Sequence, residues 1–171
     1  MIQLKKQVRK KVLVSIIVVV LLLVISGVVA TIIIQNNKSS STTDTADAPD
    51  YATVLPEGKT ITQLDGWDRV SPDGKDPVYA YNDSIDGVAI SVSQQPLPAA
   101  FKEATDSHIA DLAKGDNATN AIQTGDTTFY IGTSAKGPQS VYLAKNGLLI
   151  LIKSEAKIKD ASWSKYVASL K

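Results

Sequence analysis

The single histidine of the chain, His108, limits the chemistry that this sequence can support. Metal sites built on two histidines are excluded, and the absence of cysteine excludes disulfides, thiolate metal sites and cysteine nucleophiles. A Ser-His-Asp triad or a Ser–Lys pair is compatible with the composition, but no Gly-x-Ser-x-Gly elbow frames a serine. Neither a P-loop nor a Gly-x-Gly-x-x-Gly pattern occurs. We therefore predict no catalytic residue, no metal ligand and no cofactor, and we interpret His108 as a packing residue.

The most unusual local string is Ser93-Gln94-Gln95-Pro96-Leu97-Pro98. Two polar glutamines at a strand end, ahead of two prolines, either line a cleft or simply end the strand. Tyr79 and Tyr81 alternate on a neighbouring expected strand and so share one face. These four residues, Gln94, Gln95, Tyr79 and Tyr81, form our candidate binding surface. A wider aromatic face for peptide or glycan is the related hypothesis, and ordinary packing is favoured over it: Trp67, Tyr79, Tyr81, Tyr130, Tyr142, Trp163 and Tyr166.

Residues 12–34 form a run of 23 residues without charge, of which 19 are apolar. As a helix the run would be about 34 Å long, enough for a hydrocarbon core of about 30 Å. It exceeds the apolar region of a cleaved signal peptide, about 7–15 residues, so we predict an uncleaved signal anchor, with cleavage as the alternative. The basic flank at residues 1–11 carries no acid and predicts a cytoplasmic N terminus and an extracytoplasmic C-terminal domain. It contains Lys5, Lys6, Arg9, Lys10 and Lys11.

The chain after the apolar run is mildly acidic, with 13 basic and 17 acidic side chains and hence a net charge of −4. This charge argues against a nucleic-acid partner. Residues 44–86 hold ten of the acids, but the spacing of a calcium loop is absent, and Asp-Gly pairs such as Asp86-Gly87 are typical of turns. We expect the lipid bilayer as one partner and an envelope protein or glycan as another.

Two segments follow the expected membrane span. Residues 35–56 are dominated by Ser, Thr, Asp and Asn, and hold too few large apolar side chains to offset the entropy of ordering. We predict a flexible linker there, followed by one folded domain over residues 57–171.

Alternating apolar residues and turn signals predict a series of strands in the outer domain. Asn146-Gly147 between two apolar runs indicates a hairpin, because both residues accept a positive φ. The stretch 148–152 is apolar without alternation, which is typical of a central strand covered on both faces. A further hairpin turn is expected over 83–87. The expected strands cover about 60–64, 67–70, 77–81, 87–95, 118–124, 127–133, 139–145 and 147–153.

Two helices complete the expected domain. The first covers about 98–113, with Phe101, His108 and Leu112 on its apolar stripe, and the second covers about 160–170, with Trp163 and Tyr166 on its buried face. The fold class is therefore α+β: one N-terminal transmembrane helix, a flexible stalk, and an antiparallel sheet of about five or six strands with two packed helices.

Four strings carry a resemblance: ISVSQQPLP (residues 90–98), YIGTSAKGPQSVY (130–142), NGLLILIKS (146–154) and W-x-x-Y-x-x-S-L (163–170). Together with the basic stub, anchor and stalk, they make the chain resemble uncharacterised single-pass envelope proteins of bacteria of the candidate phyla radiation. The outer domain alone is loosely similar to extracytoplasmic domains of unknown function in bacterial membrane-anchored proteins. The resemblance implies a cell-surface location and carries over no catalytic residue.

These observations favour a membrane-anchored, extracytoplasmic binding or interaction module over an enzyme. One alternative is a membrane-anchored envelope hydrolase that pairs a serine with His108 or with a lysine. Another is an accessory subunit of an envelope signalling or secretion complex.

Overall fold

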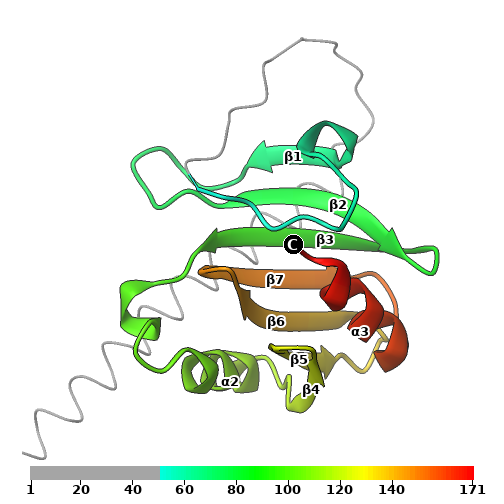
Figure 1. Cartoon of the computed structure of the whole chain (residues 1–171). Helices are drawn as coiled ribbons and strands as arrows, with labels where there is room; N and C mark the ends of the chain where they lie inside the picture. The colour runs from blue at the N-terminus through cyan, green and yellow to red at the C-terminus, as the bar shows by residue number, and fades with distance from the viewer. Residues whose placement is uncertain (1–50) are drawn as a thin grey trace, which may run out of the picture. The chain divides into compact units, whose positions relative to one another are not determined.

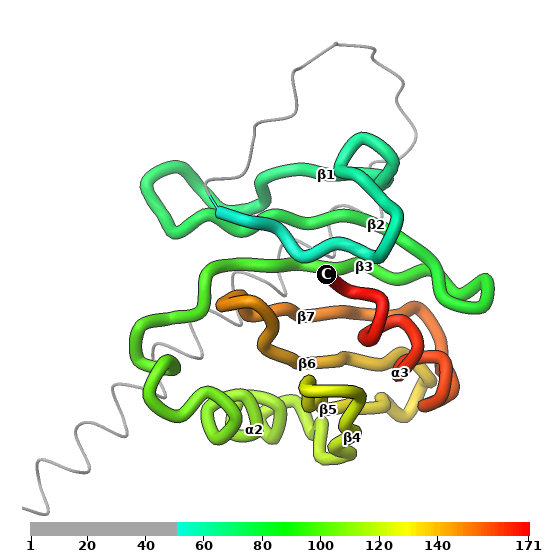
Figure 2. Tube along the Cα trace, viewed as in Figure 1, coloured from blue at the N-terminus to red at the C-terminus, as the bar shows by residue number. Residues whose placement is uncertain are grey.

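The computed structural model of the chain describes residues 51–171 (Figures 1 and 2). The expected stub (1–11), the expected membrane span (12–34) and most of the expected linker lie outside the described residues. Within 51–171, no helix is long and apolar enough to cross a bilayer. The membrane span therefore stays a prediction from the sequence.

A seven-stranded antiparallel sheet forms the body of the domain, in the order β1-β2-β3-β7-β6-β5-β4 (Figure 1). With two α-helices beside this sheet, the α+β class is confirmed. The expected number of five or six strands was too low: strands form at seven of the eight expected ranges, all but 60–64. The strands are β1 (Asp65–Arg69), β2 (Tyr79–Ile85), β3 (Val88–Pro96), β4 (Asn120–Thr124), β5 (Thr127–Thr133), β6 (Gln139–Lys145) and β7 (Leu148–Ser154).

The central strand is β7, which pairs with β3 on one side and with β6 on the other. Its residues Leu148 to Leu151 are all buried, as the continuous apolar run predicted. Ile152 lies between Val92 of β3 and Val141 of β6, so a row of branched side chains crosses three strands on one face. This face carries the main hydrophobic core.

Two-residue turns set the register of the hairpins. Asn146 and Gly147 have φ values of 50° and 76°, which confirms the predicted turn between β6 and β7. The turn expected over 83–87 is shorter, because β2 continues to Ile85 and only Asp86 and Gly87 take positive φ. A third two-residue turn, Gly125-Asp126, joins β4 to β5.

Helix α3 (Asp160–Ser169) packs against the core face of the sheet, with Trp163, Tyr166 and Val167 buried. The second predicted helix and its buried face are thereby confirmed. The helix contacts both β2 and β4, which are separated by four other strands in the sheet. The sheet therefore curves around α3 (Figure 1).

The first predicted helix, 98–113, is divided in two. A 3₁₀ turn, η2 (Ala99–Phe101), precedes α2 (Thr105–Gly115), because Ala104 has non-helical dihedrals of φ −149° and ψ 56°. The Thr105 hydroxyl donates a hydrogen bond of 3.0 Å to the Phe101 carbonyl across this break. The buried residues of α2 are Ile109, Leu112 and Ala113, and His108 of the expected apolar stripe is only half-buried.

The chain that leaves α2 lies close against β5. A Cβ on Gly132 would come to 3.0 Å from the Ala118 Cα and from the Asp116 carbonyl oxygen, so a side chain there would require this backbone to move. The Tyr142 hydroxyl of β6 donates a hydrogen bond to the Asp116 carboxylate. Both contacts fix the C-terminal end of α2 over the sheet face opposite α3.

The expected strand over 60–64 is not formed. Residues Ile61–Gln63 are instead a 3₁₀ turn, η1, with a capping box between Thr60 and Gln63. The Gln63 Oε1 accepts hydrogen bonds from the Thr60 amide at 2.8 Å and from its hydroxyl at 3.0 Å. A Thr-x-x-Gln pattern at the start of a turn gives this local alternative to an extended strand.

The folded domain begins earlier than residue 57. The amide of Leu55 donates to the Lys171 carbonyl and the amide of Lys171 donates to the Leu55 carbonyl, both at 2.9 Å. Val54 is only 1% exposed and belongs to the core. Figure 2 shows the start of the described chain beside its C-terminal end. Residues 51–56, expected to be linker, are therefore part of the domain.

One buried amide, Gln139 at the start of β6, ties the segment between β7 and α3 to the sheet. Its Oε1 accepts hydrogen bonds from the Ile158 amide at 2.6 Å and from the Trp163 indole nitrogen at 2.9 Å. Its Nε2 donates to the Thr133 hydroxyl at 3.1 Å. One side chain thus satisfies two buried donors from two different segments.

We expect Gln139→Leu to lower the free energy of unfolding by about 2–5 kcal/mol, because two buried donors lose their acceptor. Chemical denaturation followed by tryptophan fluorescence measures the change. The control is Lys136→Gln on the exposed β5–β6 connection, which should stay within about 0.5 kcal/mol of the parent. Equal stability of the two variants would contradict the role assigned to Gln139.

Candidate functional site

The four residues predicted as a binding surface are all buried. Their exposed fractions are 1% for Gln94, 7% for Gln95, 2% for Tyr79 and 1% for Tyr81. Tyr79 and Gln94 are register partners across β2 and β3, so the structure does bring two of the four together. Gln95 points to the opposite face, because side chains alternate along a strand. The four do not form an exposed surface, and this prediction is corrected.

Gln94 instead binds the segment that enters the domain. Its Oε1 accepts a hydrogen bond of 2.9 Å from the Val54 amide, and its Nε2 lies 3.4 Å from the Val54 carbonyl oxygen. The Tyr51 hydroxyl donates to the Gln94 carbonyl at 2.5 Å. A side-chain amide here reproduces the donor and acceptor of a neighbouring strand, which is why a polar residue is stable in the core.

The aromatic residues pack rather than form one common surface. Trp67 is stacked on Tyr79 at 5.3 Å and on Tyr81 at 6.1 Å between ring centroids, and Tyr51 meets Tyr79 edge-on at 5.7 Å. Trp163 and Tyr166 are buried in the same core as Tyr81, Tyr142 is buried on the opposite face of the sheet, and Tyr130 is half-buried on β5. The aromatic group at β1 and β2 fastens the edge strand and the entering segment to the sheet.

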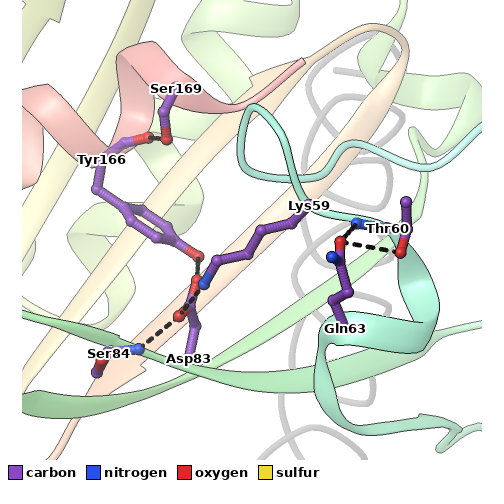
Figure 3. Close-up of polar contacts among 7 residues, drawn as sticks. All are labelled: Lys59, Thr60, Gln63, Asp83, Ser84, Tyr166 and Ser169. Carbon is purple, nitrogen blue, oxygen red and sulfur yellow. Dashed lines mark hydrogen bonds and ion pairs between the residues drawn. The ribbon is translucent and has the colours of Figure 1, made fainter.

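A polar cluster around Asp83 is the arrangement in the described domain that most resembles a functional site (Figure 3). Its Oδ1 lies 2.6 Å from the Lys59 Nζ and accepts a hydrogen bond of 2.8 Å from the Ser84 amide. Its Oδ2 accepts a hydrogen bond of 3.2 Å from the Tyr166 hydroxyl. The side chain of Asp83 is 8% exposed and that of Lys59 is 41% exposed, so the ion pair opens to solvent on one side.

The tyrosines of this cluster are weak acids. Burial raises the pKa of Tyr81 to about 12, and the Asp83 carboxylate adds to the rise against an opposing effect of Tyr166. Burial also raises the pKa of Tyr166, with further contributions from Tyr81 and Asp83. Both phenols therefore stay protonated at neutral pH, and the Tyr166 hydroxyl donates to the Asp83 carboxylate. The cluster is built to hold three segments together: the chain at Lys59, strand β2 and helix α3.

His108 packs against a neighbouring aromatic ring. It is stacked on Phe101, with 4.8 Å between ring centroids and 17° between ring planes. Among residues 51–171, no hydrogen bond joins the His108 imidazole to a serine or a carboxylate, and no group of three metal-ligating side chains occurs. The basic flank of the expected anchor, Lys5, Lys6, Arg9, Lys10 and Lys11, lies outside the described residues.

Comparison with known proteins adds no assignment: no family model, no curated protein and no solved structure matches this chain.

Sequence reasoning missed Asp83, Lys59 and Gln139. Asp83 was assigned to a turn because it precedes Ser84 and an Asp-Gly pair, and no sequence pattern links it to Lys59 or to Tyr166, 83 residues away. Gln139 begins an apolar strand, and a polar residue at that position is also compatible with an exposed strand end. Its two donors come from a segment whose path depends on the folded sheet.

We expect Asp83→Ala to lower the free energy of unfolding by about 1–3 kcal/mol, since a poorly exposed acceptor of three donors is lost. Thermal and urea denaturation measure the effect. The control is Asp76→Ala at an exposed position, which should change the free energy of unfolding by about 0.5 kcal/mol or less. If both variants unfold alike, the Asp83 cluster does not hold the domain together.

Alkaline titration tests the buried phenols. The pKa of the Tyr81 phenol is about 12 in the folded state and about 10 in the unfolded chain. The unfolded state therefore binds fewer protons between these values, so stability is complete below pH 10 and falls as the pH rises toward 12. Tyr81→Phe should reduce this loss. A tyrosinate absorbance curve showing all six tyrosines ionising together near pH 10 would contradict the burial of Tyr81, Tyr142 and Tyr166.

Proposed function

We propose that this chain is a single-pass, membrane-anchored interaction module of the bacterial envelope, with its C-terminal domain outside the cell. The observation that carries the proposal is the uncharged run at residues 12–34 behind five basic side chains and no acid. Such a run satisfies the length of a bilayer span, and its basic flank favours the cytoplasmic side.

The described domain adds a second line of support. Its first segment is held at Val54 by Gln94 and at Leu55 by Lys171, so the chain enters the fold at a fixed position. Only residues 35–50 then separate the expected span from the domain. Fully extended, 16 residues reach at most about 55 Å, which keeps the domain close to the membrane surface.

The chemistry of the described residues favours binding over catalysis as the role of the domain. Three of its poorly exposed polar side chains hold segments together: Gln94 and Gln139 bind backbone amides, and Asp83 binds Lys59 and Tyr166. His108 is stacked on Phe101. A rigid domain of this kind presents its exposed strand edges and turns to a protein or glycan of the envelope.

Membrane placement gives the first test. We expect the full chain to stay in the membrane fraction after an alkaline wash, and to lose its C-terminal domain to protease added from outside. Removal of residues 1–34 should release the domain into the soluble fraction. Replacing Lys5, Lys6, Arg9, Lys10 and Lys11 by Gln should invert part of the population, whereas replacing the exposed Lys136 and Lys157 should not. A full chain recovered in the soluble fraction would contradict the proposal.

Crosslinking in intact membranes, followed by mass spectrometry of what is attached to residues 51–171, tests the interaction. A protein that crosslinks reproducibly to this domain would support the proposal. A domain that crosslinks to nothing and retains no envelope glycan would overturn it.

A further inference from the structure

The strand β4 is an edge of the sheet: helix α3 contacts it, and the Asn120 side chain donates a hydrogen bond of 3.2 Å to Asp160, but no strand of the described domain pairs with its outer side. In the part of the chain that the structure describes, β4 has β5 as its neighbour on one side only. Its sequence, Asn-Ala-Ile-Gln-Thr, contains no charge, no proline and no glycine, and its register with β5 is unbroken. Such an edge presents unpaired backbone N–H and C=O groups to any further strand.

The opposite edge is protected. Three of the five residues of β1 are charged, namely Asp65, Asp68 and Arg69. The register of β1 with β2 is also irregular between Asp65 and Asp68, around Gly66. Charges and bulges are the devices by which edge strands avoid pairing, so the domain blocks one edge and leaves the other open.

The turn fixes which backbone groups of β4 face outward. A two-residue turn is closed by a hydrogen-bonded pair, here Thr124 and Thr127. Hydrogen-bonded pairs alternate along an antiparallel ladder, so Ile122 and Asn120 are also bonded toward β5. The backbone groups of Ala121 and Gln123 therefore point away from the sheet, and the side chains of both residues are exposed.

We propose that β4 pairs with β4 of a second copy of this chain, antiparallel about Ile122. In this register Ile122 lies opposite Ile122 of the second copy, and Ala121 lies opposite Gln123 of the second copy. The outward backbone groups then form two hydrogen-bonded pairs, and the isoleucines meet in the closer, non-bonded position.

A second copy of β4 can complement this edge without opposing like charges. Only an extended polypeptide offers donors and acceptors at the spacing of a sheet edge. Antiparallel pairing about Ile122 places no charged side chain opposite another charged side chain. The nearest acid, Asp126, would lie opposite Ala118 of the second copy. The inference rests on the described domain and does not depend on the membrane anchor.

Cysteine crosslinking tests the register, because the chain has no cysteine of its own. Full-length Ile122→Cys in membranes should form a disulfide-linked dimer, since the facing Cα atoms would lie about 4.5 Å apart. In the Gln123→Cys variant each cysteine would lie opposite Ala121 of the second copy, so this variant should crosslink about tenfold less. Asp68→Cys on β1, at the other edge of the sheet, should also crosslink about tenfold less. Equal crosslinking at positions 122 and 68, or none at 122, would overturn the proposal.

Exposed charges give a second test that leaves the core untouched. Ala121→Lys with Gln123→Lys places like charges opposite each other twice, and should weaken self-association of the full chain in detergent by about tenfold. Ala121→Lys with Gln123→Glu places opposite charges there and should restore it. Analytical ultracentrifugation measures both. A monomeric parent chain, or two double variants that associate equally, would show that β4 does not join two copies.

Discussion

The pairing of the first described segment with the end of the chain is the interaction on which the rest of this domain depends. Leu55 and Lys171 exchange two backbone hydrogen bonds, and the Glu57 amide adds a third to the Ser169 carbonyl. This pairing fixes the end of α3 against the entering chain. It also places Lys59 beside Asp83 and Tyr166, so the polar cluster on β2 follows from it. Opening the pair would release both ends of the fold at once.

Buried amides provide the second constraint. Segments outside the sheet cannot use its ladder, and their backbone donors still need partners once they are removed from water. Gln94 supplies such partners for Val54, and Gln139 supplies them for Ile158 and for the Trp163 indole. Burying each glutamine costs desolvation free energy. The burial of apolar core residues in the segment that the glutamine attaches offsets this cost. The core is therefore held by packing within the sheet and by amides at its margins.

Features that arise from local sequence could be predicted. Asn146-Gly147 requires positive φ at both residues, the run 148–152 is apolar on both faces, and α3 carries a regular buried stripe. The α+β class followed from these elements. The start of α2 could not be predicted, because the break at Ala104 competes with a continuous periodicity that runs through it.

The candidate site shows where such reasoning stops. Gln94 is polar, as a residue lining a cleft would be. Its partner, Val54, lies 40 positions away in a segment whose sequence predicted a linker. Low apolar content over residues 35–56 predicted a flexible linker, but residues 51–56 are attached to the Gln94 side chain and to the C-terminal end of the chain. Tertiary contacts of this kind leave no local pattern, so both the linker boundary and the binding surface were misplaced.

For a domain that we propose to be tethered at its N terminus, the attachment of the entering chain decides how rigidly the domain is held. Amide hydrogen exchange on the full chain measures this attachment most directly. We expect the amides of Leu55, Glu57 and Lys171 to be protected to the same degree as that of Ile152 in the central strand, because they open only when the whole domain unfolds. Exchange of these three amides at the rate of an unstructured peptide, with Ile152 still protected, would contradict the account.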